Sequence, residues 1–277
     1  MTRFLLLSVL LFSVSAVQAK ITRERVEHFD VEPGAHIEIN IHGGSIQVTV
    51  GESDRVEVVL KQTARTNSES EADEMIAELD TLIEQSRGNI RVITHPQRSS
   101  GSWWSRIKSN NRVQTSARLT VPAQVNLNLD TSGGGITVTG LVDGDLVADT
   151  SGGPIRVTGA RGDLNLDTSG GGITVKEAYG RVRADTSGGG IRIDYIGPET
   201  TDVNADTSGG GITIGLDPRG GYDLNADTSG GGVSVEGLNF NAHKRDRTHA
   251  EGEINGGGVR VRADTSGGGI KIYAAER

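Results

Sequence analysis

The sequence predicts an all-β protein: a parallel β-solenoid with coils of about 18 to 21 residues and one N-terminal α-helix packed as an insertion or a cap. Three observations predict this fold. The hexapeptide Asp-Thr-Ser-Gly-Gly-Gly recurs, apolar and polar residues alternate on both sides of it, and glycine makes up 40 of the 277 residues, about twice its average share. One such unit cannot bury its apolar face alone, whereas stacked units share a continuous core.

The hexapeptide sets the predicted coil. Six of its seven copies read DTSGGG, and the copy at Asp149 carries Pro154 in place of the third glycine. Successive copies are 19, 18, 18, 21, 21 and 37 residues apart. They begin at Asp130, Asp149, Asp167, Asp185, Asp206, Asp227 and Asp264, and a degenerate copy begins at Glu253. This period is too short for a β-propeller blade, which needs about 40 residues.

Each repeat predicts a strand, a sharp turn and a second strand. In the first strand, Leu164, Leu166 and Thr168 share one face. Glycine tolerates the turn, and the Asp, Thr and Ser before it can hydrogen-bond backbone N–H groups. The second strand presents a pair of β-branched residues to the core in each copy: Ile136/Val138, Ile155/Val157, Ile173/Val175, Ile191/Ile193, Ile212/Ile214, Val233/Val235, Val259/Val261 and Ile270/Ile272.

The N-terminal part of the chain predicts an export signal and one helix. Residues 1–19 combine Arg3, an apolar stretch and a small-residue cleavage site, which is typical of a signal peptide. Residues 20–128 predict a strand–helix–strand part of the solenoid, and residues 129–277 its repeats. The helix is expected to begin at a capping box of Ser70 to Asp73 and to end at Gly88. Its apolar stripe comprises Ala72, Ile76, Leu79 and Ile83.

The composition excludes several functions. A net charge of −8 and a pI near 5.3 do not fit the basic surface of a nucleic-acid-binding protein. The absence of cysteine excludes disulfides, a thiolate zinc site and a cysteine nucleophile. No transmembrane segment is expected after signal cleavage, so the mature protein is predicted to be periplasmic or extracellular.

These motifs together resemble the DUF4097 family of putative adhesins, which are β-strand-repeat proteins of bacterial cell envelopes. The repeated Asp-Thr-Ser-Gly-Gly-Gly-Ile-x-Val units carry the resemblance, together with residues 72–93, the strand at residues 117–123, and Gly256 to Gly258 followed by Asp264. The resemblance implies a parallel β-solenoid with an adhesive or binding role, and it implies no catalytic residues.

Two loops and two columns of side chains are the candidate binding sites. The loop at residues 96–111 holds Trp103, Trp104 and Arg106, residue types that are favoured at binding hot spots, although it is more simply an insertion that folds back on the solenoid. The loop at residues 239–252 holds two histidines and is expected to be solvated. The outward column of the second strand alternates threonine with basic residues, including Arg156, Arg192 and Arg260, and could complement an acidic glycan.

The repeated aspartates form the other column. Stacked carboxylates about 5 Å apart repel one another, so backbone N–H groups or Ca²⁺ must offset their charge. The candidate Ca²⁺ ligands are Asp149, Asp167, Asp185, Asp206 and Asp227. Asp precedes the glycines here, unlike in known Ca²⁺-binding repeats, so a purely structural turn is the favoured interpretation and no cofactor is otherwise expected.

The sequence therefore predicts a non-enzymatic, exported binding protein whose partner is an envelope protein or a glycan. Two alternatives remain: a structural envelope protein without a discrete ligand, and a carbohydrate-active β-helix enzyme. The repeat is too uniform to indicate a catalytic cleft. The oligomeric state and the number of faces in a coil stay open.

Overall fold

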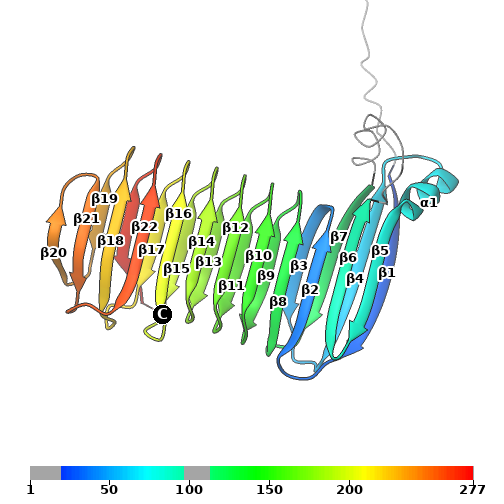
Figure 1. Ribbon diagram of the computed structural model, residues 1–277, viewed down its shortest axis with the longest axis horizontal. Helices are drawn as coiled ribbons and strands as arrows, with labels where there is room; N and C mark the ends of the chain where they lie inside the picture. The colour runs from blue at the N-terminus through cyan, green and yellow to red at the C-terminus, as the bar shows by residue number, and fades with distance from the viewer. Residues whose placement is uncertain (1–19, 97–112, 277) are drawn as a thin grey trace, which may run out of the picture.

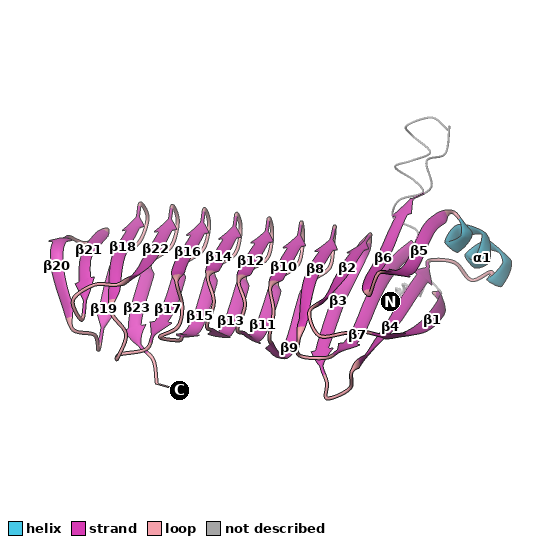
Figure 2. Cartoon of the chain, turned by 60° about the horizontal axis from the view of Figure 1, so that its bottom comes forward, coloured by secondary structure: helices cyan, strands magenta, loops and turns pink. Residues whose placement is uncertain are grey.

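The computed structural model describes residues 20–96 and 113–276. These residues form two long sheets that face each other around one continuous apolar core (Figure 1, Figure 2). The all-β prediction is confirmed, and strand pairing is parallel along most of both sheets. Within the described residues, no helix is long and apolar enough to cross a membrane. The signal peptide predicted at residues 1–19 lies outside the described residues.

The first sheet, sheet A, has 11 strands. Its order in space is β1 (Ile21–Asp30), β4 (Arg55–Ala64), β7 (Val113–Val121), β3 (Gly43–Val50), β9 (Ile136–Val142), β11 (Ile155–Ala160), β13 (Ile173–Ala178), β15 (Ile191–Ile196), β17 (Ile212–Leu216), β23 (Ile270–Ala274) and β19 (Val233–Glu236).

The second sheet, sheet B, has 12 strands. Its order is β20 (Phe240–Arg245), β21 (His249–Ile254), β18 (Tyr222–Thr228), β22 (Val259–Thr265), β16 (Asp202–Thr207), β14 (Val182–Thr186), β12 (Leu164–Thr168), β10 (Leu146–Thr150), β8 (Val125–Thr131), β2 (Ala35–Ile41), β6 (Asn89–Pro96) and β5 (Leu79–Ser86). A strand of sheet B and the strand of sheet A that follows it, such as β12 and β13, are called a coil below.

The threonine of each repeat is a structural residue. Each of the seven threonines is at most 7% exposed, and its hydroxyl donates to a glycine carbonyl of the neighbouring coil over 2.6–2.8 Å. In six repeats the same hydroxyl also accepts a backbone N–H from a glycine of its own turn. Gly171, for example, donates to Thr168 and accepts from Thr186. The turns are therefore joined by a hydrogen-bonded relay, which satisfies buried backbone groups.

The middle glycine of each turn is required by the close approach of neighbouring coils. A Cβ atom placed on Gly171 would lie 2.2 Å from the carbonyl oxygen of Gly153, and the middle glycines of the other repeats would meet backbone atoms at 2.2–2.3 Å. Real Cβ atoms do not approach backbone this closely. The threonine and the middle glycine of the repeat are therefore both required for the coils to stack.

The coils are not stacked in the order of the chain. At the C-terminal end, the coil formed by β22 and β23 lies between the coil of β16 and β17 and the coil of β18 and β19. At the other end, β2 lies between β6 and β8, and β3 between β7 and β9. The strands are therefore out of chain order at both ends of the stack. Edge strands β5 and β20 belong to antiparallel hairpins, β1 pairs antiparallel with β4, and β19 pairs parallel with β23.

The predicted helix is shorter than expected. Helix α1 (Glu69–Ala77) begins at Ser68, whose side chain accepts the backbone N–H of Glu71, rather than at Ser70. Leu79 and Ile83, which were assigned to the helical stripe, belong to strand β5, which pairs antiparallel with β6. Residues four apart share a face in a strand as well as in a helix, so their spacing did not distinguish the two.

The glycine expected to end the helix lies in a β-turn instead. Arg87 and Gly88 have positive φ angles of 52° and 81° and form the two-residue connection between β5 and β6, as in a type I′ hairpin. Helix α1 packs Ala72 and Met75 against Ala64 and Val113, so it covers one corner of the N-terminal end (Figure 1).

The prediction of a solvated loop at residues 239–252 is also wrong, because these residues form most of the hairpin of β20 and β21. Strand β20 is the outer edge of sheet B. It carries the exposed cations Lys244 and Arg245, and its pairing with β21 is interrupted between Ala242 and Lys244. Charges and a bulge on an edge strand discourage pairing with other chains.

Candidate functional site

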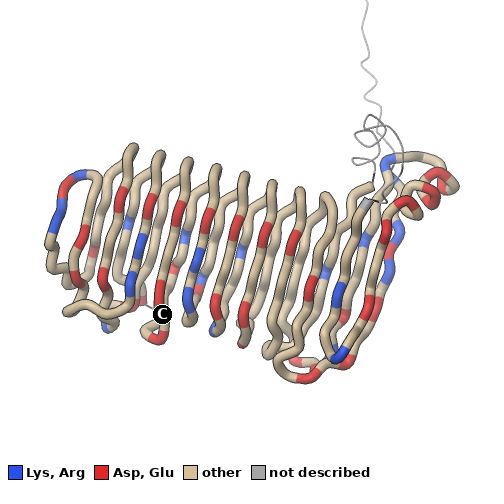
Figure 3. Tube along the Cα trace, in the orientation of Figure 1, with Lys and Arg blue, Asp and Glu red and all other residues tan. Residues whose placement is uncertain are grey.

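The aspartates of the seven repeats form one column on the outer surface of sheet B. Asp130, Asp149, Asp167, Asp185, Asp206, Asp264 and Asp227 are paired in register from strand to strand in that order. Because each precedes a buried threonine by one residue, its side chain points to the opposite face of the strand. Figure 3 shows the acidic positions recurring from coil to coil. Adjacent members lie about 4.8 Å apart, the spacing of neighbouring strands.

Only some carboxylates of this aspartate column have a side-chain partner. Arg183 lies 2.9 Å from Asp185, Arg262 lies 2.6 Å from Asp264, and the ring of His249 contacts Asp227. Within the described residues, Asp149, Asp167 and Asp206 have no hydrogen bond or ion pair. The backbone N–H groups of the turn go to the threonines, so the turn does not offset these charges as the sequence suggested.

Burial raises the pKa of three aspartates of the column, Asp130, Asp149 and Asp185. Partial burial raises the pKa of Asp149, and the charges of Asp167 and Asp130 on either side raise it further. Burial likewise raises the pKa of Asp185, against the lowering effect of Arg183. A raised carboxyl pKa means that ionisation costs more in the folded than in the unfolded chain. Ionisation of Asp149 and of Asp185 therefore opposes folding at neutral pH.

This cost predicts the effect of removing one charge. The variant Asp149→Asn is expected to raise the free energy of unfolding at pH 7 by up to about 1 kcal/mol, since it removes two repulsive neighbour contacts. The gain should shrink as the pH falls and vanish well below 3.8, the ordinary carboxyl pKa, because Asp149 is then protonated in both the folded and the unfolded state. Chemical denaturation at pH 3.5, 5 and 7 checks this, and a loss of stability at pH 7 would contradict it.

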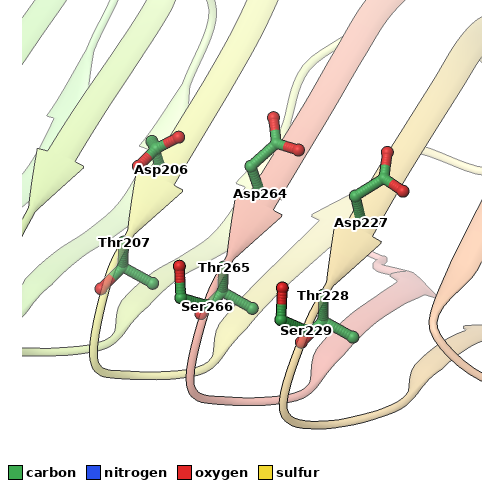
Figure 4. Close-up of a pocket in the computed structure, with 8 residues that line it drawn as sticks. All are labelled: Asp206, Thr207, Asp227, Thr228, Ser229, Asp264, Thr265 and Ser266. Atoms are coloured by element: carbon green, nitrogen blue, oxygen red, sulfur yellow. The ribbon is translucent and has the colours of Figure 1, made fainter.

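A hollow lies where the coil of β22 is inserted. Asp206, Asp264 and Asp227 stand side by side along it, with hydroxyls of Ser229, Ser266 and the repeat threonines beneath (Figure 4). Its volume is about 260 Å³. The candidate set named from sequence omitted Asp264, because Asp264 is distant in the chain and only the inserted coil brings it between Asp206 and Asp227. The hollow is open and polar, which suits a solvated cationic group better than an apolar one.

A metal centre is not formed by these side chains as they stand. Among residues 20–96 and 113–276, no group of three or more His, Cys, Asp or Glu residues has the geometry to hold a metal ion. Ca²⁺ binding by Asp149, Asp167, Asp185, Asp206 and Asp227 therefore stays a prediction.

The threonine and basic column lies on the opposite sheet. Thr137, Arg156, Thr174, Arg192, Thr213, Lys271 and Ser234 are in register on sheet A. Arg156 and Arg192 are exposed, and Arg192 lies 2.5 Å from Asp194. The two surfaces thus carry different chemistry, an acidic column on sheet B and a mixed column on sheet A.

Arg260 does not belong to that column. Val259 and Val261 were expected in a second strand, but they lie in β22, which pairs with β16 and β18 of sheet B. Arg260 is therefore on the sheet of the aspartates, 3.9 Å from Asp202. Arg260 was assigned to the wrong sheet because the degenerate copy at Glu253 was expected to turn from one sheet to the other. Its glycines instead link β21 to β22, which both belong to sheet B. Trp103, Trp104 and Arg106 lie outside the described residues.

Comparison with known families agrees with this architecture. A family model described as Toastrack DUF4097 matches residues 80–273, which include every DTSGGG repeat. The chain belongs to the Toastrack DUF4097 family. No curated protein matches this Toastrack chain significantly.

Solved structures from three bacteria match the chain over most of its length. A "putative cell adhesion protein" from Clostridium sporogenes is 15% identical with a TM-score of 0.36, and the match covers 91% of the Toastrack chain and 100% of that chain. A "putative adhesin" from Bacteroides fragilis is 11% identical, with a TM-score of 0.47 and coverage of 90% and 97%. A "putative lipid binding protein" from Parabacteroides distasonis is 13% identical, with a TM-score of 0.37 and coverage of 90% and 96%.

Proposed function

We propose that this chain is a non-enzymatic binding protein of the bacterial cell envelope, exported by residues 1–19, and that it holds an extended partner on the aspartate column of sheet B. The partner is an envelope protein or a glycan that presents cationic groups in a row. In this proposal the repeating unit is a solenoid coil of 18 to 21 residues, and each coil adds one carboxylate to the column at the strand spacing of about 4.8 Å.

The observation that carries the proposal is a contrast within the repeat. Threonine and the middle glycine are kept in all seven copies, and stacking requires both of them. The aspartate is also kept in all seven copies, yet Asp149, Asp167 and Asp206 contribute no hydrogen bond or ion pair within the described residues, and ionisation of Asp149 opposes folding. A side chain that recurs against stability indicates a role in binding.

The position two residues earlier supports this contrast. Val147, Asn165, Arg183, Asn204, Arg262 and Asn225 occupy the neighbouring outward column of sheet B in register. Apolar, amide and basic side chains are all accepted there. A solvent-facing position of this sheet therefore does not need a carboxylate for folding.

A binding experiment with defined cationic probes tests the proposal. Oligomers of glucosamine and of lysine are titrated into residues 20–277, first in the native protein and then in the triple variant Asp149→Asn, Asp167→Asn, Asp185→Asn. Binding to the native protein should weaken with added salt, and the triple variant should bind at least tenfold more weakly. A matched control removes three acids on sheet A with Glu24→Gln, Asp30→Asn and Glu57→Gln.

The outcomes separate the candidate functions. Loss of binding in the triple variant alone supports the aspartate column. Equal loss in the control means that net charge, not the column, attracts the probes. Absence of binding to every probe favours a structural envelope protein, and turnover of a glycan would favour an enzyme.

Calcium is tested separately by thermal unfolding of residues 20–277 in EDTA and in millimolar Ca²⁺. We expect the two Tm values to agree, because Asp precedes the glycines in this repeat, unlike in known Ca²⁺-binding repeats. A large upward shift with Ca²⁺ that Asp167→Asn abolishes would instead show that the column binds Ca²⁺ in the folded state.

A further inference from the structure

The coil formed by β22 and β23 occupies a slot in the stack. Strand β22 pairs in parallel with β16 on one side and with β18 on the other, and β23 pairs with β17 and β19. The chain passes from β17 to β18 through residues 217–221 and skips one coil position on the way. Residues 259–275 return later and fill that position.

The walls of the slot bind the inserted coil mainly through the hydrogen bonds of the repeat. Thr265 donates to the carbonyl of Gly210 over 2.7 Å, and Thr228 donates to the carbonyl of Gly268 over 2.6 Å. These are the same contacts that join coils in the middle of the stack. Backbone hydrogen bonds also cross the slot, for example from Ile212 to Gly269 and from Ile270 to Gly232. Further side chains of the inserted coil contact other coils: Arg260 contacts Asp202, Lys271 contacts Glu236, and Tyr273 donates to the carbonyl of Asp194. A second copy of residues 259–275 would make every one of these contacts equally well.

A glycine-rich hinge at residues 255–258 connects the inserted coil to β21. Asn255, Gly256, Gly257 and Gly258 have successive positive φ angles of 51°, 86°, 83° and 148°. Glycine leaves such conformations at little cost, so the segment can extend. The folded-back hinge is held at the surface by the side chain of Asn255, which donates to the carbonyls of Pro218 and Gly220.

We propose that residues 259–275 are exchanged between two copies of this chain, so that each copy fills the slot of the other in a two-fold symmetric dimer. All strand pairs and threonine contacts of the coil are kept in the exchanged dimer, and only the hinge at residues 255–258 changes conformation. Exchange of an identical element is a low-cost route to a dimer, because the interface already exists within the monomer. This inference does not depend on what the aspartate column binds.

One cysteine pair reports both arrangements. Asn204 and Arg262 are register partners on β16 and β22, about 4.8 Å apart, which is within disulfide range. The chain has no cysteine of its own. In Asn204→Cys/Arg262→Cys, the disulfide forms within one chain in the closed monomer and between chains in the exchanged dimer. Asn165→Cys/Arg183→Cys joins β12 and β14 and stays within one chain in both arrangements.

The two variants are unfolded, refolded at high protein concentration, separated by size, and oxidised before denaturing electrophoresis. We expect the dimer fraction of the slot pair to run as a covalent dimer and that of the control pair to run as a monomer. Deletion of Gly256 and Gly257 should raise the dimer fraction at least tenfold, because a short hinge cannot fold back. Only intrachain disulfides in the slot-pair dimer, or no dimer even in the folded deletion variant, would overturn the proposal.

Discussion

The variant Gly171→Ala is expected to lose about 3 kcal/mol or more of unfolding free energy, at the upper end of the cost of forcing extra atoms into a packed interior. The added methyl would lie 2.2 Å from the carbonyl oxygen of Gly153 and 2.4 Å from its carbonyl carbon. Both are backbone atoms, which cannot move aside as a flexible side chain could. The neighbouring coil must therefore shift, which also breaks the hydrogen bond from Thr168 to the Gly153 carbonyl.

A matched control exists within a single turn. Gly231 is a middle glycine whose Cβ would meet the carbonyl oxygen of Gly268 at 2.3 Å, whereas the Cβ of Gly232 would find its nearest neighbour at 3.4 Å. Gly231→Ala should destabilise the protein as Gly171→Ala does, while Gly232→Ala should change its stability little. Chemical denaturation measures all three, and equal effects at Gly231 and Gly232 would contradict the stacking argument.

The variant Asp217→Ala is expected to cost about 3 kcal/mol, the order found when one partner of a buried charged hydrogen-bond network is removed. Asp217 lies in the corner between β17 and β18, with its side chain only 2% exposed. It accepts the hydroxyl of Tyr195 at 2.7 Å and the guanidinium of Arg219 at 2.6 and 2.9 Å. The hydroxyl of Tyr222 donates to its backbone carbonyl. Removing the carboxylate leaves the buried Tyr195 hydroxyl without its acceptor.

The pH dependence of this variant follows from the same contacts. The hydrogen bonds from Arg219, together with that from Tyr195, hold the pKa of Asp217 well below its ordinary 3.8, while burial raises the pKa of Tyr222 to about 12. A lowered carboxyl pKa stabilises the folded state above the unfolded pKa, and the effect is lost as the pH falls through the folded pKa. The difference between native protein and Asp217→Ala should thus be constant near neutral pH and shrink below pH 3.8. Chemical denaturation across this pH range measures the loss of stability in Asp217→Ala. The variant Asp143→Ala, which changes an exposed aspartate at another corner, is the control.

The repeat could be predicted from sequence because its constraints are local. Alternating apolar residues fix the inward faces of strands such as β12, and the glycine run fixes the turn, so the all-β fold followed directly. The role of Thr168 was only partly foreseen, since its hydroxyl bonds the neighbouring coil as well as its own turn. Contacts between coils are invisible in the sequence of a single coil.

The errors share a different cause. Leu79 and Ile83 fit the helical and the strand period equally, and only pairing with β6 decides between them. Arg260 was misplaced because a glycine run signals a turn without saying which strands it joins. The insertion of β22 between β16 and β18 depends on the whole stack, so no local pattern could show that Asp264 lies beside both Asp206 and Asp227.

The most direct test of the central claim compares three variants of one repeat by chemical denaturation at pH 7: Asp167→Asn, Thr168→Val and Gly171→Ala. We predict unchanged or higher stability for Asp167→Asn, a loss of about 1 to 3 kcal/mol for Thr168→Val from unpaired buried groups, and a larger loss for Gly171→Ala. A loss in Asp167→Asn as large as that in Thr168→Val would contradict the account, because the aspartate would then be part of the turn and no longer free to bind a partner.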